Sequence, residues 1–212
     1  MSVYITEECV GVAPHELRFP GIISCMAVAV VLGDGSLAGC HITGFSTEET
    51  LLKLLKEQIN GRAIARVYMI GSPKEHFQYT KREHFQFTTN SDRRGVSDLT
   101  YNDKARIFGH NGQVFTVAIA TGHAAGAPNG LHVRVVSHGP QELPSIEVAA
   151  EQPGGIRYSR SAGFTFSAGC EIWKLRPDGS KALPPSIPTG ETNSGSYQFR
   201  KVDPSAICCF RH

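Results

Sequence analysis

Two apolar, β-branched runs joined by a glycine-containing turn constrain the fold more than any other feature of the chain. Residues 22–32 and 37–43 each have the composition of a buried strand. The tetrapeptide between them, Gly33-Asp34-Gly35-Ser36, consists of residues that hairpin turns favour. The sequence therefore predicts an antiparallel hairpin over residues 22–43.

The length of the turn decides which side chains share a face of this hairpin. A three-residue loop at 33–35, with Gly35 in the left-handed conformation of a bulged type I turn, would place Leu32 opposite Ser36. A two-residue loop would shift the register by one position and send each side chain of one strand to the other face. The site described next depends on the three-residue loop.

Under that register, Cys25 and His41 are diagonal neighbours on one face of the hairpin. Ala27 lies opposite His41 and Cys25 lies opposite Thr43, and diagonal positions are about 7 to 8 Å apart at the backbone. The other members of this face are small: Ala27, Ala29 and Gly39. We expect these small residues to leave room for a substrate, with Ala27 and Gly39 in contact with it.

The opposite face of the hairpin is entirely apolar and is predicted to face the core. Its members are Met26, Val28, Val30, Leu32, Ala38, Cys40 and Ile42. A helix and a strand follow the hairpin: Ser46 can cap the helix, Glu49 can complete a capping box, and leucines with helical spacing continue as far as Asn60-Gly61. Residues 62–70 have the composition of the strand.

The remainder of the chain is predicted to be mostly β. Strands are expected at 114–121, 131–136, 146–149, 163–175 and 197–202. Two related motifs in a polar stretch, His76-Phe77-Gln78-Tyr79 and His84-Phe85-Gln86-Phe87, are interpreted as two similar strands or a chance match. The length of 212 residues favours a single domain over residues 1–212.

Charge and composition limit the partners and cofactors. The chain has 21 Lys+Arg and 19 Asp+Glu, a formal net charge of +2, and no long basic stripe, so we expect no nucleic-acid partner. No apolar run approaches the roughly 20 residues that span a bilayer, and the N-terminus does not have the pattern of a Sec signal, so no membrane association is expected. The six cysteines include no Cys-x-x-Cys pair, and neither a metal nor another cofactor is expected.

A thiol and an imidazole in this arrangement can carry out nucleophilic catalysis. An imidazolium beside Cys25 would favour the thiolate, and His41 could then protonate the leaving group and activate water. Main-chain amides around Ser24 and Cys25 could hold the oxyanion, so Ser24 is also a predicted substrate contact. Cysteine is among the most buried residue types, so ordinary packing of the two side chains is the alternative.

The segment Gly21-Ile22-Ile23-Ser24-Cys25, followed sixteen residues later by His41 and then by a helix and a strand, resembles the glutamine deamidases. This family includes the chemotaxis receptor deamidases and the cytotoxic necrotizing factor toxins, and the resemblance covers roughly residues 20–72. It implies an α/β fold, a mixed, mostly antiparallel β-sandwich with one main helix packed on the sheet. It also implies a hydrolase that converts a protein glutamine to glutamate, with Cys25 as nucleophile and His41 as base and acid.

The resemblance also raises the question of which group orients His41. The chemotaxis enzymes use a threonine six residues before the cysteine, and this chain has Phe19 there. The toxins use a main-chain carbonyl, so the Phe19 carbonyl or the Thr43 hydroxyl is the candidate third catalytic group. The implied partner is a protein that presents a glutamine. Both a cytoplasmic enzyme and an effector or toxin that is secreted without a Sec signal and acts in the cytosol of a target cell fit this interpretation, and amine transfer to the same glutamine remains an open possibility.

Two other interpretations remain open. The segment 166–173 around Cys170 is similar to the Ser-x-Gly-Cys motif of L,D-transpeptidase-like enzymes, although no His-Gly pair precedes it closely. A non-enzymatic β-rich binding module, whose cysteines only pack, is the other alternative. The histidines at 110, 123, 132 and 138 do not have the spacing of metal ligands, so a zinc enzyme is not favoured.

Overall fold

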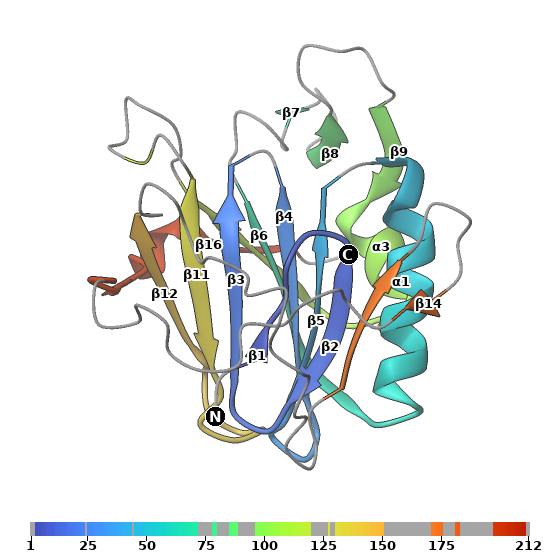
Figure 1. Cartoon of the computed structure of the whole chain (residues 1–212), viewed down its shortest axis with the longest axis horizontal. Helices are drawn as coiled ribbons and strands as arrows, with labels where there is room; N and C mark the ends of the chain where they lie inside the picture. The colour runs from blue at the N-terminus through green and yellow to red at the C-terminus, as the bar shows by residue number, and fades with distance from the viewer. Residues whose placement is uncertain are drawn as a thin grey trace.

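A computed structural model describes residues 3–23, 25–43, 45–71, 78–79, 85–88, 96–119, 127, 130–150, 171–175, 181–182 and 197–210. Its described part forms three layers, in which an eight-stranded sheet lies between a five-stranded sheet and two helices. Helix α1 lies on the other side of the molecule from β11 and β12 (Figure 1). The predicted fold class, a mixed α/β sandwich with mostly antiparallel strands and a main helix packed on the sheet, is confirmed.

The eight-stranded sheet contains the predicted hairpin at its centre. Its order is β14 (Lys181–Ala182), β13 (Glu171–Leu175), β2 (Cys9–Ala13), β5 (Leu37–Ile42), β4 (Met26–Leu32), β6 (Ile64–Gly71), β10 (Val114–Ala118) and β16 (Ile207–Phe210). All neighbouring strands are antiparallel except β6 and β10, which are parallel. Strands β4 and β5 therefore have paired neighbours on both sides.

The five-stranded sheet packs against one face of the larger sheet. Its order is β1 (Val3–Tyr4), β3 (Glu16–Ile22), β11 (Leu131–Val136), β12 (Ser145–Ala150) and β15 (Arg200–Lys201). The core between the two sheets includes Leu17 and Phe19 from β3 and Ala27, Ala29 and Val31 from β4. Because β2 and β3 follow each other in the chain but belong to different sheets, the N-terminal segment crosses between the layers.

The helices cover the other face of the larger sheet. Helix α1 (Phe45–Ile59) places Leu51, Leu52 and Leu55 against the apolar face of the hairpin, and α3 (Tyr101–Ile107) packs beside α1. All seven residues predicted for the core face of the hairpin lie in this second core. Neither described helix is long and apolar enough to cross a membrane.

The two helices are joined by an ion pair that is almost completely closed to solvent. Lys104 Nζ of α3 lies 2.8 Å from Glu48 Oε1 of α1, and the two side chains are 0% and 3% exposed. Burial lowers the pKa of Lys104, and the neighbouring Glu48 carboxylate opposes that effect. This pair fixes the first turn of α1, which follows directly after the strand that carries His41.

Most of the predicted elements agree with the structure to within a few residues where it describes them. The first strand of the hairpin, predicted from residue 22, has to be corrected: it begins at Met26, because Ile22 ends β3 in the other sheet. Helix α1 begins at Phe45, one residue before the expected cap, and ends as expected before Asn60 and Gly61, which have φ of 51° and 73°. The described residues of the two similar motifs are paired strands, with β7 (Gln78–Tyr79) antiparallel to β8 (Phe85–Thr88), and β9 (Val96–Thr100) pairs with β8. Residues 163–170, predicted as strand, lie outside the described residues.

Candidate functional site

The turn between β4 and β5 has the geometry on which the predicted site depends. The Leu32 amide donates to the Ser36 carbonyl at 2.8 Å, and the Gly35 amide donates to the Leu32 carbonyl at 2.9 Å. Gly35 has a φ of 85°, the left-handed conformation that glycine adopts without a steric penalty. The three-residue loop is therefore confirmed.

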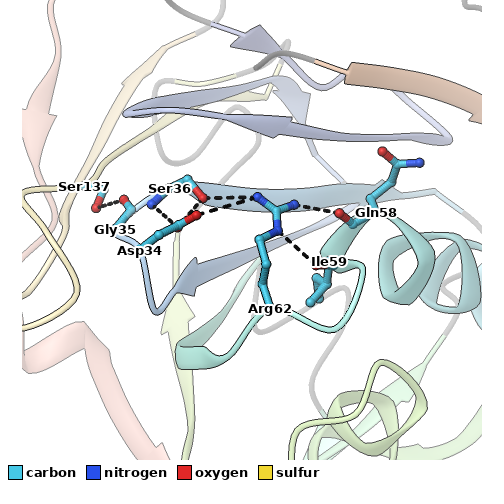
Figure 2. Close-up of polar contacts among 7 residues, drawn as sticks. All are labelled: Asp34, Gly35, Ser36, Gln58, Ile59, Arg62 and Ser137. Carbon is cyan, nitrogen blue, oxygen red and sulfur yellow. Dashed lines mark hydrogen bonds and ion pairs between the residues drawn. The ribbon is translucent and has the colours of Figure 1, made fainter. Parts of the chain in front are cut away.

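Side chains around the turn hold this loop in place (Figure 2). Asp34 Oδ1 accepts hydrogen bonds from the amide and the hydroxyl of Ser36, at 2.9 and 2.5 Å. These two hydrogen bonds are the main cause of a lowered pKa for Asp34. Ser137 Oγ donates to the Gly35 carbonyl at 2.6 Å, which ties the loop to the five-stranded sheet. Arg62 lies 4.0 Å from Asp34 and also donates to main-chain carbonyls at the end of α1.

The register that follows from this loop places Cys25 and His41 on the same face of the hairpin. Ala27 pairs with His41 and Ala29 with Gly39, as predicted. Cys25, Ala27 and Ala29 contribute to the core between the two sheets, whereas Met26 and Val28 contribute to the core under the helices. Cys25 and His41 therefore face the layer between the two sheets.

The room left by the small residues of this face is filled by the protein itself. Ala27 is fully buried, and a Cβ atom on Gly39 would lie 2.9 Å from both Leu17 Cδ1 and Phe19 Cζ. The five-stranded sheet thus occupies the space in which a substrate was expected to bind. The prediction that Ala27 and Gly39 contact substrate has to be corrected, because both positions serve the packing of the two sheets.

Cys25 lies at the end of this packed layer, where the chain crosses from β3 to β4. Its side chain is only 6% exposed, and the preceding strand ends at the upper rim of the molecule in Figure 1. Ser24, the other predicted substrate contact in this crossover, lies outside the described residues.

His41 is completely buried and is oriented by the main chain of the first turn. Its Nδ1 atom lies 3.1 Å from the carbonyl oxygen of Ile5. A carbonyl can only accept, so Nδ1 carries the proton and Nε2 carries the lone pair. Nε2 has no hydrogen-bond partner among the described residues, so it is a buried base whose lone pair is unused.

Burial also sets the charge of His41. The loss of solvent lowers its pKa to about 4, and the hydrogen bond to Ile5 opposes this shift only in part. His41 is therefore neutral at pH 7. The sequence predicts an imidazolium that favours the Cys25 thiolate, whereas the structure favours a neutral imidazole, which can act only as a base toward a thiol.

The group that orients His41 is neither of the two that the sequence suggested. Thr43 Oγ1 donates to Glu8 Oε1 at 3.4 Å, and the orienting acceptor is the carbonyl of Ile5 rather than that of Phe19. A main-chain carbonyl leaves no signature in the sequence, and Ile5 precedes His41 by 36 residues. The carbonyl of Ile5, and not the hydroxyl of Thr43, therefore orients the imidazole of His41.

The low pKa of His41 predicts a loss of stability in acid. The unfolded chain binds a proton near the ordinary pKa of 6.5 and the folded chain only near 4, so this stabilisation is present above pH 6.5 and is lost as the pH falls toward 4. The difference between these two pKa values corresponds to roughly 3 kcal/mol of folding stability, at 1.36 kcal/mol per pKa unit. Urea unfolding between pH 7 and pH 4 should show a shallower loss for His41→Gln than for the wild type. The exposed His138→Gln variant should follow the wild type, and equal slopes for all three proteins would contradict the prediction.

The other histidines named in the sequence analysis do not form a cluster in the described structure. His110 Nε2 lies 3.1 Å from the Gln113 carbonyl, and His138 Nε2 lies 2.8 Å from Ser145 Oγ. His132 is buried on the outer face of the five-stranded sheet, edge-on to Tyr197. No group of three potential metal ligands occurs among the described residues. Residues 123 and 170, the latter the cysteine of the transpeptidase-like interpretation, lie outside the described ranges.

Comparison of the chain with family models, with curated proteins and with solved structures gave no match. Function is therefore inferred from the geometry of the site itself.

Proposed function

We propose that this protein is a thiol amidohydrolase that converts a glutamine side chain of a protein substrate to glutamate, with Cys25 as nucleophile and His41 as base. The observation that carries the proposal is the state of His41. Its Nδ1–H is tied to the Ile5 carbonyl, and its Nε2 lone pair is buried on the face of the hairpin that also carries Cys25. A neutral imidazole in this state is prepared to accept a proton from a nearby thiol.

The chemistry follows from these two groups. Nε2 of His41 accepts the thiol proton while the Cys25 sulfur attacks the side-chain carbonyl of glutamine, and the carbonyl electrons move to oxygen. His41 then gives its proton to the departing nitrogen, ammonia leaves and a thioester remains. Water, activated by the same Nε2 lone pair, attacks the thioester, and glutamate and the free thiol are released. One water is consumed and one ammonia formed in each cycle.

Burial of the sulfur supports a glutamine as the reacting group. Cys25 is 6% exposed and His41 is fully buried, so the proposed reaction requires a substrate group that can reach a nearly buried sulfur. Glutamine presents its amide on an unbranched side chain, which a branched side chain or a main-chain peptide bond does not match. Exclusion of water around a buried pair also strengthens the electrostatic interactions that act on the reacting amide.

A cytosolic protein is the proposed substrate, either in the cell that makes this protein or in a target cell that receives it. A reduced thiol supports a reducing place of action: Cys40 is free and buried. Neither a metal nor another cofactor enters the proposed cycle. A primary amine could replace water in the second step, because the thioester is the same.

Mass spectrometry of cellular proteins tests the proposal directly. The wild type and Cys25→Ala are expressed at equal levels, and tryptic peptides are compared for the one-dalton increase that accompanies conversion of glutamine to glutamate. We expect modified peptides only with the wild type, because the variant cannot form the thioester. Cys40→Ala is the matched control, since this cysteine lies on the opposite face of the hairpin.

Two outcomes separate the related activities. Incorporation of monodansylcadaverine in place of the one-dalton change would indicate that an amine resolves the thioester. Identical peptide sets for the wild type and Cys25→Ala would rule out the deamidase and leave the binding module as the better interpretation.

A further inference from the structure

The turn that links β1 to β2 holds the end of β5 at three successive points. The Ile5 carbonyl accepts from His41 Nδ1 at 3.1 Å, the Glu8 amide donates to the His41 carbonyl at 2.9 Å, and Glu8 Oε1 accepts from the Thr43 hydroxyl at 3.4 Å. The turn thus contacts the side chain of His41, its main chain and the residue two positions later. We call residues 5–8 the β1–β2 turn.

This turn is itself held firmly. The Ile5 amide donates to the Arg18 carbonyl at 2.7 Å, and the Cys9 amide donates to the Thr6 carbonyl at 3.0 Å. The Cys9 sulfur, which is 1% exposed, lies 3.2 Å from Thr6 Oγ1 and donates to the Glu7 carbonyl at 3.6 Å. The acceptor that orients His41 therefore belongs to a folded element with contacts to both sheets.

Glu8 adopts a backbone conformation that its residue type disfavours. Its φ is 58°, in the left-handed region, where the Cβ atom of a glutamate causes a steric penalty. The other described non-glycine residue with positive φ is Asn60, which ends α1, and asparagine is a residue type that tolerates this conformation. Strained residues of this kind are concentrated at functional sites, and glycine at position 8 would remove the strain.

We propose that Glu8 is a positioning residue of the Cys25–His41 pair, an inference that rests on the proposed function. Its amide holds the main chain of β5 at His41 and its carboxylate holds the side chain of Thr43, on the two sides of Ile42, and this keeps His41 Nδ1 on the Ile5 carbonyl. The contact of the carboxylate with Thr43 explains why a strained glutamate occupies this position, because only the side chain of Glu8 reaches Thr43. Thr43 acts as the partner of Glu8 and does not touch the imidazole.

Variants at positions 8 and 43 test this role against a merely structural one. Glu8→Gly removes the carboxylate and the strain together, Glu8→Gln keeps a hydrogen-bond acceptor, and Thr43→Val removes only the donor. The control is Glu7→Ala, a neighbouring exposed glutamate. Kinetics are measured as ammonia release from carbobenzoxy-glutaminyl-glycine, and stability is measured by urea unfolding.

We expect Glu8→Gly to unfold at the same or a higher urea concentration than the wild type and to lose about ten- to hundredfold in kcat. Thr43→Val should lose a similar factor in kcat, and the double variant should lose no more than the larger single loss, because both changes break one contact. The kcat of Glu8→Gln should lie within about threefold of the wild-type value, and the kcat of Glu7→Ala should equal the wild-type value. A kcat of Glu8→Gly equal to that of the wild type would overturn the proposal, as would a loss of kcat that simply follows a loss of stability.

The tautomer of His41 provides a readout that does not need activity. In the wild type, ring ¹⁵N shifts should show a protonated Nδ1 and an unprotonated Nε2, and Glu8→Gly should shift both signals toward a mixture of tautomers. If neither the wild type nor any variant releases ammonia but the tautomer of His41 changes in Glu8→Gly, the proposed function fails and the positioning of His41 by Glu8 stands. If the tautomer is unchanged in Glu8→Gly, the positioning fails whatever the activity is.

Discussion

Replacement of His41 by glutamine is expected to slow the release of ammonia from carbobenzoxy-glutaminyl-glycine by about 10²- to 10⁴-fold, the usual contribution of a positioned general base. The same variant should slow alkylation of Cys25 by iodoacetamide at pH 7, because the thiol loses the group that accepts its proton. For the wild type, the pKa of about 4 means that the base form of His41 persists down to mildly acidic pH. The rate measured between pH 5 and pH 7 should therefore not fall with a midpoint near 6.5.

The control for this experiment is His138→Gln, because His138 is exposed and bonds only to Ser145 among the contacts of its ring. Circular dichroism and urea unfolding show whether His41→Gln remains folded at the assay temperature. A folded His41→Gln variant that alkylates and hydrolyses at the wild-type rate would show that this histidine is only a packed core residue.

Replacement of Lys104 by methionine is expected to lower the free energy of unfolding by about 3 to 5 kcal/mol at pH 7, since it leaves the Glu48 carboxylate buried without its cation. The two side chains are 0% and 3% exposed, so solvent cannot replace the lost partner. The double variant Glu48→Gln, Lys104→Met should recover most of the loss, because no buried charge remains in the pair. Urea unfolding of the wild type and both variants measures these differences. A loss for Lys104→Met below about 1 kcal/mol at pH 7 would contradict the burial of the pair.

The hairpin and its register could be predicted because both follow from local rules. Gly35 accounts for the three-residue loop, and the loop sets the register. Because side chains alternate between the two faces along each strand, this register places Cys25 and His41 on the same face. Helix α1 was predictable for the same reason, since its leucines recur with helical spacing and Asn60 with Gly61 ends it.

The parts that the sequence concealed depend on contacts between distant segments. Strands β2 and β3 were missed because Pro14 and Pro20 mark their neighbourhood as irregular, yet Pro20 lies within β3 and Pro14 lies in the turn before it. Leu17 and Phe19 fill the space over the small residues of the hairpin. This contact could not be predicted from the hairpin sequence, because Leu17 and Phe19 belong to the other sheet. Helix α3 was not predicted, because it lies in a polar stretch of the sequence. A lysine such as Lys104 does not indicate a buried position, although its ion pair keeps it buried here.

The position of β4 and β5 in the middle of an eight-stranded sheet has a consequence for how the molecule opens. Amide hydrogens in central strands that are covered on both faces exchange only when the whole domain comes apart, while edge strands such as β14 and β16 can fray on their own. His41 is therefore carried by one of these central strands, and Cys25 directly precedes the other. Partial melting at the periphery should leave the surroundings of His41 unchanged, so an activity of the proposed pair should be lost only when the whole domain unfolds.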